Sequence, residues 1–165
     1  MDSEQFKFIA GKLMIVVFIT ALLIGSIIYL NQRWERIRDI RRMADTQSVI
    51  KALEFYNVQL GHYPDKLPND GDGWNKSNTK VEGRFLEPLV KIGLLPALVF
   101  DPLNNATYYY RYQRFASGSF GCSRNFAVFQ VTDFEANNDN HGQGRCPGLD
   151  FSTLAPNGFT WFALD

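Results

Sequence analysis

Few residues of this 165-residue chain have the types and spacing that catalysis requires. Its two histidines, His62 and His141, fall in predicted loops, and no serine, cysteine or carboxylate motif accompanies either of them. They also lack the paired spacing of zinc ligands. The sequence therefore predicts that the protein is not an enzyme and that both histidines are solvated loop residues.

Two loops carry the oxygen ligands that calcium prefers. The segment Asn69-Asp70-Gly71-Asp72-Gly73 places two carboxylates in a glycine turn, but Val81 stands where an EF-hand has its last glutamate. The second loop, 133–140, is rich in acidic residues and asparagine. Solvated turns are the simpler interpretation of both loops. The hypothesis to test is a calcium ion bound by the carboxylates of the second loop, Asp133, Glu135 and Asp139.

A further candidate site is a disulfide bond. Cys122 and Cys146 are the only cysteines, and they flank a predicted strand at Asn125 to Phe134. A disulfide between them would close a loop of about 25 residues and stabilise the fold by roughly 3 kcal/mol in the chain-entropy model. Such a bond persists only in an oxidising compartment. We therefore predict the disulfide and a location outside the cytoplasm; two unpaired, small hydrophobic residues are the alternative.

The first element that positions these residues is an apolar N-terminal helix. Leu13 to Leu30 is a run of eighteen residues without a charge. As a helix it spans about 27 Å, close to the roughly 30 Å hydrocarbon core of a bilayer. Tyr29 and Trp34 lie where aromatic side chains favour lipid headgroups. A cleaved secretory signal would end in a small-x-small site, which Asn31-Gln32-Arg33 does not supply. We predict a transmembrane helix.

The distribution of charge bears on partners and on membrane orientation. The chain has no net charge, so its composition does not call for nucleic acid as a partner. Lys7 and Lys12 precede the span and five arginines follow it, a bias that by itself places the rest of the chain in the cytoplasm. The cysteines argue for the opposite side, which we favour. We expect lipid headgroups to bind these arginines, Arg33, Arg36, Arg38, Arg41 and Arg42.

Helical character continues from Asn31 to Leu60, where Gly61 and Pro64 end it. Apolar residues recur at spacings of three and four along this segment, which predicts an amphipathic helix whose stripe is covered by the rest of the protein. The stripe consists of Ile37, Ile40 and Ala44, followed by Val49, Ala52, Leu53, Tyr56 and Leu60.

The remaining segments predict a small sheet. Phe85 to Leu95 is typical of a short helix, and three aromatic and β-branched runs predict strands at Thr107 to Phe115, Asn125 to Phe134 and Gly158 to Leu164. The basic and aromatic residues of the first run are interpreted as two faces of a strand rather than a nucleic-acid site. The predicted fold is α+β, with a long N-terminal helix packed on a small antiparallel sheet. Its predicted parts are a tail at 1–12, a transmembrane helix at 13–30, an amphipathic helix at 31–60 and a globular head at 61–165.

Several short motifs resemble the type IV pilin and type II secretion pseudopilin family, and the major pseudopilin most of all. As in that family, the motifs begin in the amphipathic continuation of an apolar N-terminal helix and extend beyond it. The motifs are Ala52-Leu53-Glu54-Phe55-Tyr56, Gly61, Tyr63-Pro64, Leu94-Leu95-Pro96, Asp101-Pro102-Leu103-Asn104, Tyr108 to Tyr112 and Val131 to Glu135.

The resemblance implies a structural subunit, or an accessory (minor) component, of a type IV pilus or type II secretion filament. Its head would lie outside the cytoplasmic membrane, and its partners would be other pilin-like subunits, membrane lipid and the inner-membrane assembly platform. The 133–140 loop lies roughly where the pseudopilin binds calcium. Filament packing is then expected of Leu13, Val16, Val17, Ile19, Leu23, Ile27, Ile37 and Ile40, and the head core of Val49, Leu53, Tyr56 and Leu60.

Two positions depart from the family pattern. Family members carry a glycine, then an aromatic or apolar residue at the mature start and a glutamate five residues into the mature chain. Here Gly11 is followed by Lys12, and Val16 stands in place of the glutamate. This departure favours a minor or uncleaved subunit over a major one. The alternative function is a monomeric, membrane-anchored module that binds an extracellular ligand.

Overall fold

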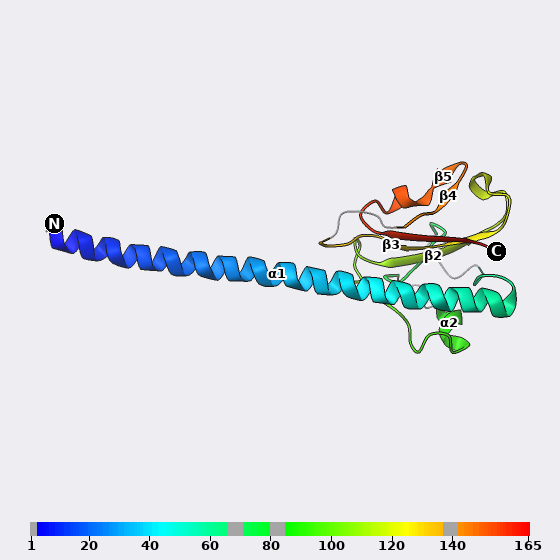
Figure 1. Cartoon of the computed structure of the whole chain (residues 1–165), viewed down its shortest axis with the longest axis horizontal. Helices are drawn as coiled ribbons and strands as arrows, with labels where there is room; N and C mark the ends of the chain where they lie inside the picture. Colours follow the sequence, from blue (N-terminus) through cyan, green and yellow to red (C-terminus); the bar gives the residue numbers. More distant parts are fainter. Residues whose placement is uncertain (1–2, 66–70, 80–84, 137–141) are drawn as a thin grey trace. The chain divides into compact units, whose positions relative to one another are not determined.

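The chain begins with one long helix. The computed structural model describes residues 3–65, 71–79, 85–136 and 142–165, and in it α1 (Ser3–Leu60) is continuous (Figure 1). The predicted tail is therefore helical from Ser3. The chain divides into two compact units, Met1–Ile37 and Arg38–Asp165. The second unit, called the head below, thus includes the last part of α1 together with residues 61–165.

The head contains a four-stranded antiparallel sheet with the strand order β1-β2-β3-β6. The three long strands, β2 (Tyr110–Phe115), β3 (Phe126–Val131) and β6 (Phe159–Leu164), lie within the three predicted runs. β1 (Asn75–Lys76) pairs with β2 at one edge. A separate two-stranded sheet joins β4 (Arg145–Cys146) to β5 (Leu149–Asp150). The other elements are α2 (Glu87–Lys91) and the 3-10 turns η1 (Ser119–Gly121) and η2 (Phe151–Leu154).

One face of the sheet packs on the head portion of α1. Val49 and Leu53 of α1 are fully buried against Tyr110, Tyr112 and Phe129 of the sheet. Because side chains alternate along a strand, the same strands present a second set of residues to the other face. The α+β arrangement of a long N-terminal helix on a small antiparallel sheet is therefore observed, and it is consistent with a pilin-like fold.

The other face of the sheet supports a second core. Phe126 and Val128 of β3 pack there with Phe151 and with the disulfide between Cys122 and Cys146. The ring of Phe126 stacks on Phe115 and Phe162, with centroids 4.9 and 5.0 Å away. All six residues of β3 are consequently buried. The predicted disulfide is present, with Cα atoms 5.2 Å apart.

The structure at the end of α1 explains the roles of Gly61 and Tyr63, which belong to two of the sequence motifs. Gly61 adopts a positive φ of 78° and donates its N–H to the Asn57 carbonyl, which closes the helix. The ring of Tyr63 then packs edge-on against Trp161, with centroids 5.3 Å apart. Tyr56 is partly buried against the core, but Leu60 is 49 % exposed. Leu60 was predicted in the core; as the last helical residue it lies beyond the part of α1 that the sheet covers.

Candidate functional site

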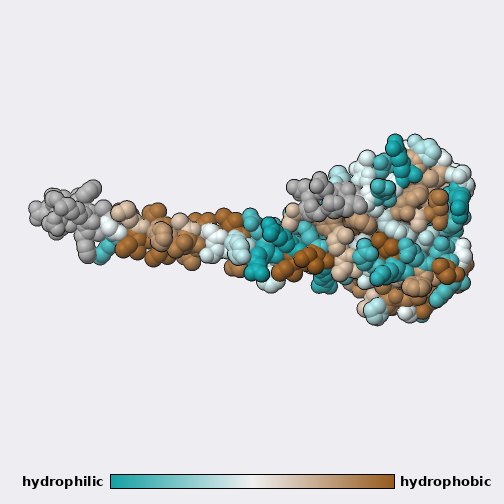
Figure 2. All heavy atoms as spheres, in the orientation of Figure 1, coloured by the Kyte–Doolittle hydropathy of each residue, from teal (hydrophilic) through white to brown (hydrophobic). Residues whose placement is uncertain are grey.

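The apolar run in the first unit is bare of protein contacts. From Leu13 to Leu30 each of the large hydrophobic side chains is at least half exposed, and much of the segment is brown in Figure 2. An 18-residue window here has a mean hydropathy of 2.7, with none of it buried. Thr20 and Ser26 donate their hydroxyl hydrogens to helix carbonyls, so neither hydroxyl is left without a hydrogen-bond partner. This helix is long and apolar enough to cross a membrane.

In the head, α1 has a second apolar surface that faces away from the sheet. Ile40 is 69 % exposed, Phe55 58 % and Val58 82 %, and Ala44 between them is also exposed. We call Ile40, Ala44, Phe55 and Val58 the outer face. The predicted single stripe from Ile40 to Val49 is therefore wrong. Nine residues amount to two and a half helical turns, roughly, so these two side chains point to opposite sides.

The buried face of α1 carries an ion network where apolar residues were predicted. Arg42 is completely buried, and its guanidinium binds Asp101 through Nε–Oδ2 and Nη2–Oδ1 distances of 2.6 and 3.1 Å. Its Nη1 donates to Asp39 Oδ1 at 2.6 Å and to Glu135 Oε1 at 2.7 Å. The guanidinium also lies 4.8 Å from the ring centroid of Tyr108. A single cation thus joins three carboxylates from three parts of the head.

Neighbouring groups complete this network. The Asp39 carboxylate accepts the backbone N–H groups of Glu135 and Ala136 at 3.0 and 2.8 Å. Arg38 donates from Nε to Glu135 Oε1 at 2.7 Å, and this bond, with that from Arg42, holds the pKa of Glu135 below its ordinary value. Burial by itself would lower the pKa of Arg42, but hydrogen bonds to Asp101 and Glu135 raise it instead. The network fixes α1 to the turn at Asp101 and to the segment after β3.

The sequence predicts lipid headgroups as the partners of Arg38 and Arg42, and this network is not apparent from it. For Arg42 that expectation is wrong, because no part of its side chain is exposed. One sequence signal existed. Asp39, Arg42 and Thr46 precede Val49 and Leu53 at the spacing of three and four that marks one helix face, and all five are buried.

Thr46 on this face has the one buried side-chain polar atom that lacks a hydrogen-bond partner, within the part of the chain that the structure describes. Thr46→Val keeps the β-branched shape and removes the unsatisfied hydroxyl. We expect the free energy of unfolding to rise by about 1 kcal/mol, since an unpaired buried hydroxyl costs roughly that much or more. Chemical denaturation measures the change. Thr46→Ser retains the hydroxyl, and stabilisation by that variant would contradict the explanation.

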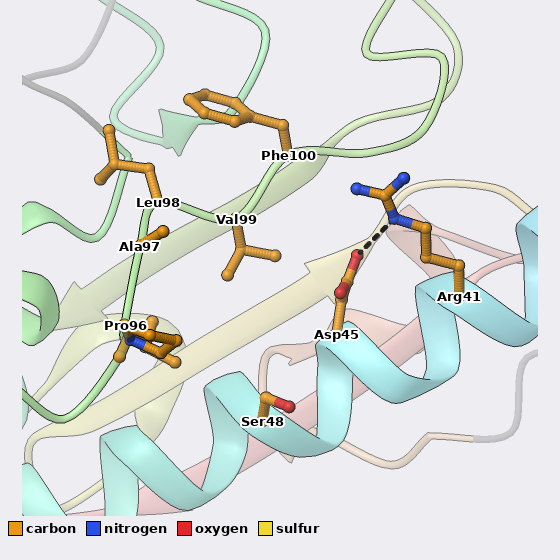
Figure 3. Close-up of a pocket in the computed structure, with 9 residues that line it drawn as sticks. Arg41, Asp45, Ser48, Pro96, Ala97, Leu98, Val99 and Phe100 are labelled. Carbon is orange, nitrogen blue, oxygen red and sulfur yellow. Dashed lines mark ion pairs between the residues drawn. The ribbon is translucent and has the colours of Figure 1, made fainter.

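A surface hollow of about 260 Å³ lies between α1 and the 95–100 loop (Figure 3). Asp45 at its edge accepts the Tyr110 hydroxyl hydrogen at 3.0 Å, and its carboxylate lies 3.8 Å from Arg41 Nε. Burial raises the pKa of Asp45. Ser48 is committed to the Ala44 carbonyl at 3.0 Å. No base activates this serine within the described residues, so the hollow does not have the geometry of nucleophilic catalysis.

The calcium hypothesis stays a prediction. Glu135 binds two arginines as described above, burial raises the pKa of Asp133, and Asp139 and Asp70 lie outside the described residues. Asp72 of the first loop pairs with Lys76 Nζ at 2.5 Å. Over the ranges that the structure describes, no three His, Cys, Asp or Glu side chains are grouped to hold a metal. His62 lies near the end of α1 with Nδ1 2.8 Å from the Tyr63 carbonyl, and His141 lies outside those ranges.

A thermal shift assay tests that hypothesis. If Asp133, Glu135 and Asp139 bind calcium only in the folded state, a hundredfold excess over Kd should stabilise the head by about 2.7 kcal/mol. The chain should then melt several degrees higher in calcium than in chelator, and Asp139→Ala should remove the difference. Identical melting curves would identify this loop as a solvated turn.

The disulfide is a structural site, and its removal should be measurable. We expect Cys122→Ser with Cys146→Ser to lower the free energy of unfolding by about 3 kcal/mol, because the unfolded chain regains the entropy of the closed loop. Thermal melting with and without reductant measures this in the parent, while the double variant should no longer respond to reductant. Free thiols in native, non-reduced protein would contradict the bond itself.

Comparisons of the chain with protein-family models, with curated proteins and with solved structures give no match. The likeness to pilins therefore rests on the sequence motifs and on the α+β architecture.

Proposed function

We propose that this protein is a structural subunit, or an accessory component, of a filament of the type IV pilus or type II secretion kind. The observation that carries this proposal is the outer face of α1. Exposed large apolar side chains are costly in water when they gather on one surface. The bare run at Leu13 to Leu30 has lipid to cover it, whereas the outer face belongs to the head and calls for protein. Helices of neighbouring subunits are the proposed cover.

We further propose that the helix is a single-pass anchor in the cytoplasmic membrane, with the head outside. The disulfide supports this orientation, because such bonds persist in oxidising compartments. The arginines after the span are the opposing observation. Three of the five have carboxylate partners in the head, since Arg38 binds Glu135, Arg41 lies near Asp45 and Arg42 binds Asp101. Their place beside the span is thus explained by the fold of the head.

Photo-crosslinking in native membranes tests the filament proposal. A photoreactive amino acid at Phe55 or Val58 should give crosslinked ladders that contain this chain, and the same group at Leu154, exposed elsewhere on the head, should not. Sheared surface material should contain filaments that react with an antibody to the chain. Phe55→Asp should remove both signals and leave the folded head intact. Crosslinks absent from every position, with the chain monomeric, would instead support the membrane-anchored ligand-binding module.

A further inference from the structure

A row of polar residues crosses the sheet on the face opposite α1. The strand register places Lys76 of β1 opposite Arg111 of β2, Arg111 opposite Gln130 of β3, and Gln130 opposite Thr160 of β6. Tyr110, Tyr112 and Phe129 face α1, so this row, which alternates with them, faces away. Gln130 and Thr160 are buried, whereas Arg111 is half-buried near the β1 edge of the sheet.

Hydrogen bonds along the row hold Arg111 in one orientation. The Gln130 amide donates to Thr160 Oγ1 at 2.8 Å and to the Phe151 carbonyl at 2.6 Å, which fixes the direction of its oxygen. That oxygen accepts from Arg111 Nε at 2.7 Å, and the Leu154 carbonyl accepts from Arg111 Nη2 at 2.9 Å. The guanidinium lies 4.5 Å from the ring centroid of Trp74. Arg111 is therefore positioned by a buried amide, one backbone carbonyl and an indole ring.

What Arg111 does not have, among the described residues, is a carboxylate bound to it. Arg42 and Arg114, the other arginines well covered by the head, each bind one directly. Asp72, whose charge favours the Arg111 cation, is itself bound by Lys76 Nζ at 2.5 Å and by the Trp74 N–H at 3.1 Å. Burial lowers the pKa of Arg111 below its ordinary value. At Arg42 burial acts in the same direction, but the hydrogen bonds to carboxylates outweigh it and the pKa is raised. A half-buried guanidinium to which no carboxylate of the described residues is directly bound is a costly arrangement.

We propose that Arg111 is the anchor of a binding site for an oxyanion, the carboxylate or phosphate group of a ligand, beside the ring of Trp74. A guanidinium has five N–H donors in a planar fork that matches such groups in two-point hydrogen bonds. Gln130, Leu154 and the Tyr109 side chain occupy only part of this fork. The ligand supplies the directly bound anion that the described residues do not. This site does not depend on the filament proposal, because it lies on the opposite side of the sheet from α1.

Titration of the full-length protein in nonionic detergent tests the site. The probes are inorganic phosphate and glucuronate, with glucose as the uncharged control, and the readout is the indole N–H resonance of Trp74. Trp34 and Trp161 are internal references. We expect phosphate or glucuronate to shift the Trp74 resonance to saturation, and glucose to leave it in place. Whichever anion saturates at the lower concentration identifies the ligand group. A Trp74 resonance that neither anion moves would overturn the proposal.

Two variants assign the binding to Arg111. Arg111→Gln should abolish the shift, whereas Lys51→Gln, which removes one positive charge on the α1 side, should leave it unchanged. Arg111→Lys keeps the charge without the planar fork and should weaken binding about tenfold or more. It also serves as the decisive variant if Arg111→Gln melts below the assay temperature. Binding by Arg111→Lys equal to that of the parent would overturn the proposal.

Discussion

Leu53→Asp is expected to unfold the head. Leu53 is completely buried between α1 and the sheet, in a cluster of apolar side chains. A carboxylate there must remain charged without a partner or take up a proton, and either state costs several kcal/mol. The whole stability of a domain is only about 5–15 kcal/mol. Near-ultraviolet circular dichroism of the full-length protein in detergent should lose the signal of the packed aromatic residues.

Phe55→Asp is the matched control. It makes a similar change two residues away, on the outer face, where Phe55 is 58 % exposed. The head of this variant should melt within about 0.5 kcal/mol of the parent, as exposed substitutions usually do. A Leu53→Asp protein that melts like Phe55→Asp would contradict the packing of α1 on the sheet.

The second large effect is expected from Arg42→Met. The change fills similar space but leaves Asp39, Asp101 and Glu135 without the cation that they share, and the Asp101 side chain has no exposure to water. Removing one partner of a buried ion pair costs about 3–5 kcal/mol. For a unit of this size the melting temperature should fall by roughly 10 °C or more. Differential scanning calorimetry measures both quantities.

The adjacent arginine supplies the control for this prediction. Arg41 has a side chain that is 65 % exposed and lies 3.8 Å from Asp45, so Arg41→Met should cost less than about 1 kcal/mol. Arg42→Lys should lie between the parent and Arg42→Met, because an ammonium keeps the shared positive charge but cannot make the two parallel bonds to Asp101. Equal melting of Arg41→Met and Arg42→Met would mean that the network contributes nothing to stability.

The parts of the fold that sequence predicted are those with a repeating pattern. β2, β3 and β6 are runs of six residues, long enough for alternation and for aromatic and β-branched preference to register. β1, β4 and β5 have two residues each and no periodicity to detect. The strand order depends on contacts between distant segments, which local patterns do not contain. α2 is also shorter than its predicted range, because Leu86 with a positive φ precedes it.

The ion network was missed for a different physical reason. A helix face is predicted from its apolar residues, and Arg42 and Asp39 counted as solvated charges under that rule. Their burial is possible because Asp101 and Glu135 arrive from segments 59 and 93 residues away from Arg42. Nothing near Arg42 in the sequence identifies those partners. The same limit applies to Arg111, because its lack of a bound carboxylate among the described residues becomes visible only once its neighbours on the sheet are known.

The position of β3 has a consequence for how the head folds. This strand is buried on both faces and pairs with β2 on one side and β6 on the other, and β6 is the final strand of the chain. Neither core is closed until β6 has joined the sheet, so contacts far apart in sequence must form late and together. Such topologies fold more slowly than helical bundles do. We therefore expect the head to acquire its structure in one step after its last residues have been synthesised, with its aromatic residues accessible to chaperones and proteases until then.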